Sequence, residues 1–305
     1  MYRSKTTYQE WRKGICEEIA LTSSEQCEEA QRRDWFWVLD ACAHPELPGL
    51  LWQLDANPDA WPLYMNTYME ESMHVGPWRI PCHMRSNATH WIFEQLERIP
   101  LGFLFSTNRQ KGNIAFEHLQ NILECVLSVQ ESQQRKNFLF RYYDPRIMHG
   151  LSTFHDAAWL MRIKGPMLSL HAWEPGRAIP VEKRYTKEQQ TVCKEPPQLS
   201  QAFIDHLWKE SQAHTIIGTL SGEPGEQLRA MPLPKAYQHV EHIQNILNDS
   251  PYTSNSDISF AIAYSLLAPD EGWQDILEHR VLTQSTKSSS LEAALAKAFN
   301  DAFTA

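Results

Sequence analysis

The sequence predicts an α+β protein with two lobes. The N-terminal lobe has a mixed β-sheet flanked by helices, and the C-terminal lobe is entirely helical. Short runs of aromatic and β-branched residues alternate with helical periodicity over residues 1–173. Pro, Lys and Glu then become frequent over residues 174–197, which we interpret as a connector. Residues 198–305 show only helical spacing.

The composition excludes several classes of protein. The chain has 305 residues, of which 42% are hydrophobic and 11 are tryptophan, so a packed core is expected and wholesale disorder is excluded. The net charge of −9 argues against nucleic acid as a partner, because a phosphate backbone attracts clustered Lys and Arg.

The sequence also predicts a cytoplasmic protein without membrane insertion. The N-terminus has no apolar signal region, and the longest apolar stretch, residues 260–268, is too short to span a bilayer. Six scattered cysteines form no C-x-x-C pair, which is typical of reduced, structural thiols. They are Cys16, Cys27, Cys42, Cys82, Cys125 and Cys193.

Residues 1–33 contain an amphipathic helix with Tyr8, Trp11, Ile15 and Ile19 on one side. It is either an arm that binds a partner or a helix that packs on its own lobe, and we favour the second.

The N-terminal lobe alternates predicted strands and helices. The strands are 35–39, a shorter one at 63–65, 78–82, 102–106, 137–143 and 165–170. Pro81 favours a position near the sheet edge for the third of these. Apolar spacing predicts helices over 88–97 and 113–129.

The C-terminal lobe is predicted to contain helices only. They cover 200–208, 235–247, 257–267, 272–282 and 291–303. Ser200 and the cluster Ser288–Ser290 have the composition of helix caps. Gly218–Gly225 reads GTLSGEPG, which lacks the Lys-Ser/Thr of a phosphate loop, so we expect a turn there.

The segment 138–146, FLFRYYDPR, predicts a corner between a strand and a helix. Asp144 can accept hydrogen bonds from the first N–H groups of a helix, and Pro145 suits the first helical position. The helix that follows would bury Ile147, Met148, Leu151 and Phe154.

Capping does not explain the two arginines of this segment. Arg141 lies within an apolar strand, where a lone charge is costly, so we expect a carboxylate partner or an exposed sheet face. Asp40, at the end of the first strand, is the candidate partner.

The run FRYYDPR resembles the signature of the type VI secretion effector chaperones, or adaptors, whose shared domain is domain of unknown function 4123. Other blocks follow in the same order: residues 37–41, 76–80 and 102–106, then His118-Leu119 and Gly165-Pro166. The resemblance covers about residues 35–170. It departs at 40–42, where a glycine is expected nearby, and at Arg79, where the family is more often aliphatic. The signature residues are Asp40, Arg141, Tyr142, Tyr143, Asp144, Pro145 and Arg146.

The resemblance implies a non-enzymatic adaptor that binds a toxin effector in the bacterial cytoplasm and helps to load it onto the VgrG spike protein. An immunity-type toxin inhibitor is the alternative. We expect the signature residues to be structural more than contact-making, because capping and pairing already use them.

Two further kinds of site have weaker support. His149, Ser152, His155 and Asp156 are the residue types of a hydrolase, but residues on one helix rarely form a triad and no G-x-S-x-G elbow is present. Two loose histidine groups come without a zinc motif, so no metal and no cofactor is expected. These groups are His83 with His90, and His239 with Glu241 and His242.

Three tryptophans are candidate contacts for a protein partner. Trp52 and Trp61 lie in a region rich in proline, and Trp208 lies on the first C-terminal helix. Exposed tryptophans often anchor interfaces. The alternative for Trp52 and Trp61 is that they cover the edge of the sheet.

Overall fold

In a computed structural model, the chain folds into two compact units, Met1–Glu210 and Ser211–Ala305, which are described separately. The division falls after Glu210, inside a helix, and so differs from the predicted connector. The structure describes residues 6–54, 59–67, 69–109, 112–128, 135–154, 165–184, 198–248, 250–267, 277 and 290–294.

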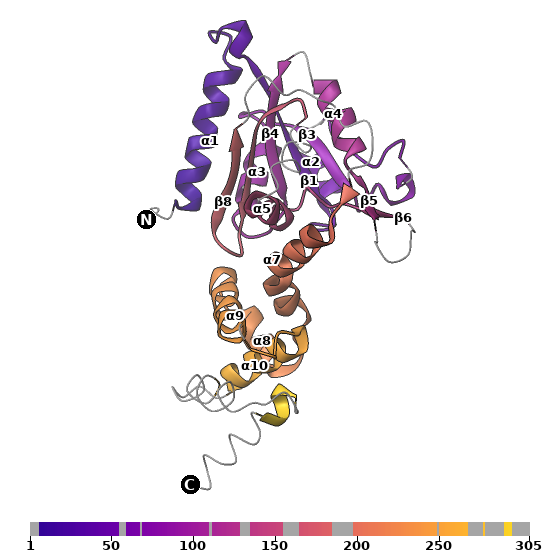
Figure 1. The fold of residues 1–305 in the computed structure, drawn as a ribbon. Coiled ribbons are helices and arrows are strands. Elements are labelled where there is room, and N and C mark those ends of the chain that lie inside the picture. Colours follow the sequence, from indigo (N-terminus) through magenta and orange to yellow (C-terminus); the bar gives the residue numbers. More distant parts are fainter. Residues whose placement is uncertain are drawn as a thin grey trace. The chain divides into compact units, whose positions relative to one another are not determined.

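The first unit is built on a six-stranded sheet in the order β2-β3-β1-β4-β7-β8, in which every neighbouring pair is antiparallel (Figure 1). The α+β class is thus confirmed, although the main sheet is antiparallel and not mixed. The strands are β1 (Arg33–Asp40), β2 (Trp61–Pro62), β3 (Pro77–Pro81), β4 (Gly102–Asn108), β7 (Met167–Glu174) and β8 (Ile179–Arg184). The short strand predicted at 63–65 is a turn, and the strand lies two residues earlier.

A small second sheet has the order β6-β5-β9 and contains a parallel pair, β5 with β9. Its strands are β5 (Glu124–Ser128), β6 (Arg135–Leu139) and β9 (Gln198–Leu199). The helix predicted over 113–129 is therefore wrong in its second half, because α4 ends at Asn121. Apolar residues at 119, 122, 123, 126 and 127 fit a helical period, but pairing with β6 makes the end of this segment a strand. The predicted strand 137–143 likewise ends early, at Leu139.

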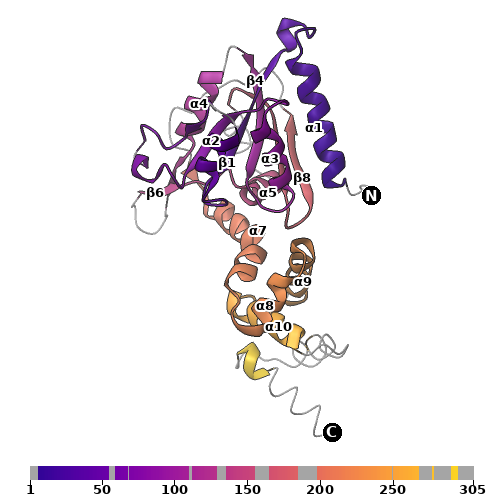
Figure 2. The same cartoon turned by 180° about the vertical axis from the view of Figure 1, so that it is seen from behind.

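Helices cover both faces of the six-stranded sheet (Figures 1 and 2). Trp35, Trp37 and Leu39 of β1 pack with α1, α2 and α3 on one face. Phe36 and Val38 pack on the other face with α4, α5 and the start of α7. β1 is thus buried on both sides, which explains its continuous apolar run. The helices are α1 (Tyr8–Ser23), α2 (Leu47–Leu54), α3 (Asn87–Leu96), α4 (Gly112–Asn121), α5 (Pro145–Thr153) and α7 (Gln201–Thr219), with short 3-10 helices at Glu29–Gln31 and Glu70–Ser72.

The N-terminal helix packs on its own unit, as favoured from the sequence. Thr7 and Glu10 form a capping box at its start. Its four predicted apolar residues are all buried, and the helix contacts β1 and β8 (Figure 1). We find no arm in the described part of α1.

Strand β8 lies inside the segment predicted as a connector. It pairs with β7 along its whole length, from Ile179 opposite Glu174 to Arg184 opposite Ser169. Pro180 and the charged residues of this segment suggested a connector, but the same composition is typical of an edge strand. Edge strands and linkers are therefore hard to distinguish here by composition.

The described part of the second unit is helical. It contains the end of α7, then α8 (Gly222–Ala230), α9 (Leu233–Leu247), α10 (Asn255–Leu267) and a helical turn at 291–294. Ala213, Tyr237, Val240, Ile258 and Ile262 are among its core residues. α8 begins within the segment 218–225 that was predicted as a turn. The predicted helix 272–282, except Leu277, and the end of 291–303 lie outside the described residues.

Gly102, the first residue of β4, lies very close to the backbone of β1. It has φ +155°, and a Cβ atom there would lie 1.9 Å from the carbonyl oxygen of Val38. Gly102→Ala is expected to lower the free energy of unfolding by about 2–4 kcal/mol, because backbone must move to relieve the clash. Urea denaturation measures this.

Gly14→Ala is the control, since a Cβ atom meets nothing within 4 Å at this position in α1. It should raise stability by about 0.5–1 kcal/mol through helix propensity. Equal effects of the two substitutions would contradict the close approach of β4 to β1.

Candidate functional site

The predicted corner between strand and helix is present. β6 ends at Leu139, and Asp144 is the N-cap of α5, with Pro145 in its first turn. Asp144 Oδ1 accepts hydrogen bonds from the backbone N–H of Arg146 at 3.0 Å and from its Nε at 2.8 Å. Oδ2 accepts another from Arg146 Nη2. The carboxylate of Asp144 thus accepts hydrogen bonds from both the backbone and the guanidinium of Arg146 at the start of the helix.

Arg141 pairs with Asp40, as predicted. Asp40 is fully buried at the end of β1, and its Oδ1 also accepts a hydrogen bond from the backbone N–H of Cys42 at 3.0 Å. Arg141 also lies over the ring of Tyr143, 5.9 Å from its centre. The ion pair therefore joins β1 to a corner that is 101 residues away in the sequence.

Burial raises the pKa of Asp40, and Arg141 and the Cys42 N–H oppose this rise. Burial alone would lower the pKa of Arg141, but Asp40, Tyr143 and Asp144 outweigh it and raise the pKa overall. Arg141 is therefore charged at every relevant pH, and it is the group that allows an ionised Asp40 to be buried.

The two tyrosines of the signature are hydrogen-bonded inside the core. Tyr142 donates to the carbonyl oxygen of Leu119 in α4 at 3.0 Å. The hydroxyl groups of Tyr143 and Tyr64 lie 3.1 Å apart. Burial raises the pKa of both signature tyrosines, so they remain protonated hydrogen-bonding groups. The corner is thus tied to α4 and to the segment after β2.

Other motif pieces also meet in this unit. His118 of α4 is buried, and a Cβ atom at Gly165 would lie 2.3 Å from its ring. Gly165 has φ +41°, so both backbone and space require glycine there. The hydroxyl groups of Ser106 in β4 and Ser169 in β7 lie 2.6 Å apart. Motif residues that are far apart in the sequence therefore contact one another in the core of this unit.

A network of charged groups lies beside α5. Arg177 donates to both carboxylate oxygens of Glu174, at 3.1 and 3.2 Å, and to the backbone carbonyl of Glu210 at 2.9 Å. Its guanidinium is also 3.2 Å from the Glu210 carboxylate. His149 Nε2 lies 3.6 Å from the same carboxylate. Burial, with a contribution from Arg177, lowers the pKa of His149 to about 4.

Of the four residues of the hydrolase alternative, the structure describes His149 and Ser152, whose side chains are not bonded to each other. Ser152 Oγ donates to the backbone carbonyl of His149 at 2.7 Å, whereas the imidazole faces Glu174 and Glu210. His155 and Asp156 lie outside the described residues. Within the described residues, His149 is therefore not placed as the base for Ser152 that a triad needs.

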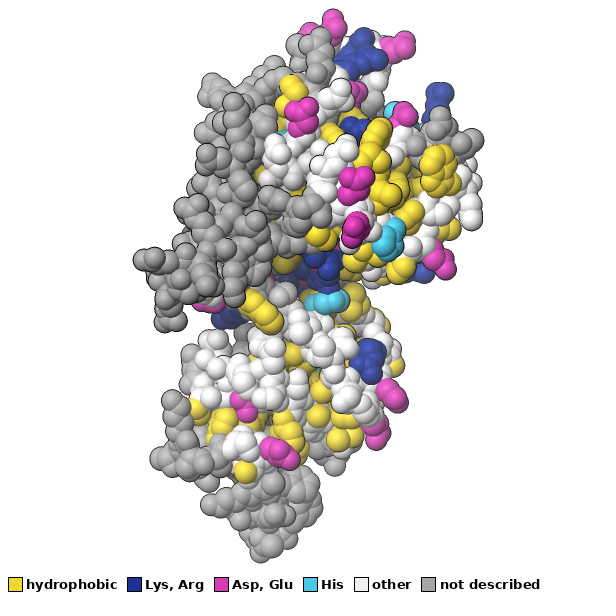
Figure 3. Space-filling model, turned by 90° about the vertical axis from the view of Figure 1, so that its right-hand side faces the viewer, with side chains coloured by type: hydrophobic (Ala, Val, Ile, Leu, Met, Phe, Trp, Pro, Cys, Tyr) yellow, Lys and Arg dark blue, Asp and Glu magenta, His cyan; other side chains and the backbone are white. Residues whose placement is uncertain are grey.

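The three candidate tryptophans are exposed. Trp52 on α2, Trp61 in β2 and Trp208 on α7 have exposed fractions of 59%, 46% and 60%. Trp61 keeps an edge-on contact with Phe116 at 6.4 Å. Figure 3 shows one face of the molecule, where hydrophobic side chains reach the surface between acidic ones. The exposure that a partner contact requires is therefore present, and the contact itself stays a prediction.

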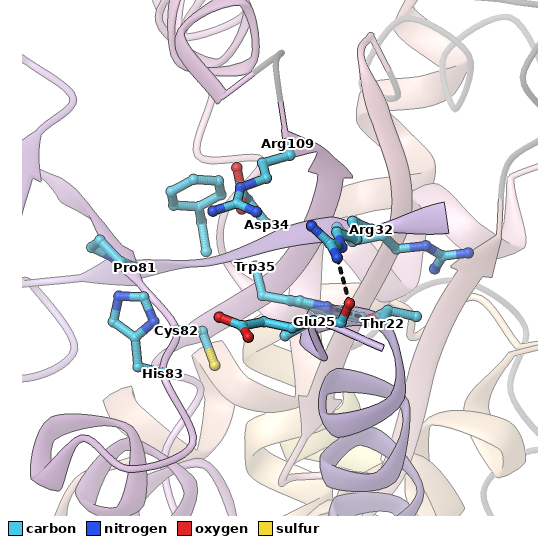
Figure 4. A pocket seen from close by; sticks show the side chains of 12 residues that line it. Thr22, Glu25, Arg32, Asp34, Trp35, Pro81, Cys82, His83 and Arg109 are labelled. Atoms are coloured by element: carbon cyan, nitrogen blue, oxygen red, sulfur yellow. Dashed lines mark hydrogen bonds between the residues drawn. The ribbon is translucent and has the colours of Figure 1, made fainter. Parts of the chain in front are cut away.

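A pocket of about 270 Å³ lies at the start of β1. In Figure 4, Arg109 and Asp34 lie together at one side of it, and Arg32 bonds to the backbone of Glu25. Sequence reasoning missed this site because its residues come from four separated segments. The lining residues are Thr22, Ser23, Glu25, Arg32, Arg33, Asp34, Trp35, Phe36, Pro81, Cys82, His83 and Arg109.

Among the described residues, no group of three or more His, Cys, Asp or Glu side chains could hold a metal ion. His239 Nε2 lies 2.8 Å from the hydroxyl of Ser265. Cys16, Cys27, Cys42 and Cys82 are free thiols. Within the same described part, no helix is both long and apolar enough to cross a membrane.

Comparison with known families adds to this geometry. Residues 35–160 match the model of a domain of unknown function, DUF4123. The DUF4123 region begins at β1 and extends past α5, so it contains both Asp40 and the corner that Arg141 ties to it. No curated protein and no solved structure shows a significant match to the chain.

The pair of Asp40 and Arg141 is expected to be essential for stability. Arg141→Met should lower the free energy of unfolding by about 3 kcal/mol at pH 7, because it leaves a buried carboxylate without a countercharge. The loss should shrink as the pH falls towards 4, since Asp40 can then be buried as the neutral acid. Urea denaturation of both proteins across this pH range measures the difference.

A double-mutant cycle with Asp40→Asn isolates the pair, and a coupling above about 1.5 kcal/mol is expected. The exposed pair of Lys13 and Glu17 in α1 is the control, with an expected coupling below about 0.5 kcal/mol. Similar couplings for the two pairs would show that the buried pair adds no more than a surface pair.

His149 should make stability depend on pH. Its folded pKa of about 4 lies below the ordinary value near 6.5, so the unfolded chain binds the extra proton between these values. Stability should therefore fall as the pH falls through this window, by about 2 kcal/mol from pH 7.5 to 5. His149→Gln should remove this part of the dependence, and an unchanged pH profile in the variant would argue against a buried neutral imidazole.

Proposed function

We propose that the chain is a non-enzymatic adaptor that binds a type VI secretion effector in the bacterial cytoplasm and helps to load it onto the VgrG spike. The observation that carries this proposal is the DUF4123 match over residues 35–160 together with the FRYYDPR corner. That corner is the sequence signature through which the chain resembles the effector adaptors.

The chemistry of the first unit is consistent with a binding role. Acidic and basic groups of the signature are engaged with each other, as Asp40 is with Arg141 and Asp144 with Arg146. Large apolar side chains are instead found at the surface, including Trp52 and Trp61. Exposed tryptophans of this kind supply much of the free energy at protein interfaces.

The experiment that tests the proposal is co-purification of the chain with the proteins encoded beside its gene. Recovery of a spike or an effector as a stable complex supports the adaptor role, and recovery of neither contradicts it. Deletion of the gene separates the alternative: loss of an adaptor stops delivery of the toxin, whereas loss of an immunity protein poisons the producing cell.

Trp52→Ala and Trp61→Ala are each expected to weaken binding to the recovered partner about tenfold or more, because a tryptophan anchor buries a large apolar area. Each variant should stay folded, with a loss of stability of about 1–2 kcal/mol, because a side chain that is about half exposed gives up only part of its apolar area. Calorimetric titration measures the affinity.

Leu21→Ala is the matched control, because Leu21 is 72% exposed in α1 and is an apolar residue outside the candidate surface. Its substitution should leave the affinity unchanged. Equal effects of all three substitutions, or no effect of either tryptophan, would remove Trp52 and Trp61 from the interface.

A further inference from the structure

Arg79 occupies an unusual position in β3. It pairs with Val38 of β1 on one side and with Trp61 of β2 on the other. Its guanidinium lies between two phenyl rings, 4.9 Å from the centre of Phe36 and 5.2 Å from that of Phe116. Two aromatic faces thus hold the cation in place and restrict its freedom.

The Nε atom of the same guanidinium lacks an acceptor in the described part of the chain. Its Nε atom is buried, and no described residue accepts a hydrogen bond from it. Asp59 acts on Arg79 only through longer-range electrostatics, which support the charged form against the lowering of the pKa by burial. A buried donor without an acceptor is costly, and native proteins keep few of them without a reason.

Arg79 also lines an open pocket of about 340 Å³. The wall contains the rings of Phe36 and Trp61, and its charged groups are Arg79, Arg109, Asp34 and Asp59. Arg109 lies beside Asp34 (Figure 4), and its positive charge opposes the rise in the pKa of Asp34 that burial causes. The charge of Arg109 also balances that of Asp34 in this pocket. Two cations and two anions make this pocket neutral on a chain whose net charge is −9.

This pocket adjoins the one in Figure 4. The two share four lining residues near the start of β1, which are Asp34, Phe36, Pro81 and Arg109. Trp61, which lines the pocket, and Ile114, which follows the lining residue Asn113 in the sequence, have exposed fractions of 46% and 41%. Two adjoining open pockets with aromatic side chains in their walls suit an extended peptide segment better than a compact small molecule.

We propose that Arg79 receives the carboxylate of an Asp or Glu side chain in an extended segment of the bound partner protein. A guanidinium fits a carboxylate through paired N–H groups, and rings that exclude water strengthen such a bond. The cation is held ready between the rings, so little freedom is lost on binding. This inference deepens the proposed function, on which the choice of a partner protein rests.

The first test compares Arg79→Met with Arg98→Met in the full chain, using the partner that co-purifies with it. Arg98 is an exposed arginine and serves as the control. Arg79→Met should weaken binding about tenfold or more while the control leaves it unchanged. The midpoint of thermal unfolding of Arg79→Met should be unchanged or higher, because an unpaired buried charge has been replaced by an apolar group of similar length. A merely structural arginine would instead lower it.

The second test needs no partner. The peptide Ac-Ala-Val-Glu-Val-Ala-NH2 at millimolar concentration should shift the Nε–H NMR signal that disappears in Arg79→Met. The matched peptide with Gln in place of Glu should not shift it.

The outcomes separate the two proposals. Equal affinity of Arg79→Met and Arg98→Met for a partner that binds the wild-type chain overturns the role of Arg79 and leaves the adaptor role intact. Failure of the wild-type chain to bind either neighbouring protein overturns the adaptor role, and the peptide test then decides the chemistry of the pocket. A dimer of the chain that Arg79→Met disrupts would make a second copy the occupant and also overturn the inference.

Discussion

The fold of the first unit depends on one requirement, that an ionised aspartate at the end of a fully buried strand be neutralised. β1 is covered on both faces, so Asp40 has no access to water. Its countercharge, Arg141, comes from a segment 101 residues later, and the direction of the corner decides whether that guanidinium can reach. Asp144 and Pro145 set this direction, because they determine where α5 starts. The helix cap at Asp144 thus helps to place Arg141 where it can pair with Asp40.

The arginines of this unit fall into two groups, and the difference separates stability from binding. Arg141, Arg146 and Arg177 each reach a buried carboxylate, and each contact joins or caps elements of the scaffold. Arg79 is comparably buried but reaches two aromatic rings and no described carboxylate. Buried charges that serve the fold are paired within the chain, since breaking such a pair is strongly destabilising. A buried charge left unpaired beside an open pocket is better explained by a partner that completes it.

Sequence reasoning succeeded where local chemistry decides the structure. Asp144 followed by Pro145 predicts a helix start from capping rules alone, and Arg141 in an apolar run of residues required a partner such as Asp40, although this arginine lies beyond the end of β6. It failed where pairing between distant segments decides: residues 124–128 fit a helical period but pair with β6, and 179–184 have the composition of a linker but pair with β7. The pocket at Arg79 could not be foreseen for the same reason. Arg79 stood out only as a departure from the aliphatic residue typical of its position.

The proposed adaptor role would require the chain to fold stably while it is alone and yet keep polar and apolar groups that find their partners only in the complex. These demands conflict, because unpaired donors and exposed tryptophans lower the stability or solubility of the free protein. In the first unit the two kinds of group lie in different places. Asp40 and Arg141 form an ion pair within the chain. Arg79 and Trp61 are instead paired residues of β3 and β2, at the edge of the sheet. Under the proposed function, substitutions at this edge should alter which partner segment is bound without disturbing the ion pair of Asp40 and Arg141.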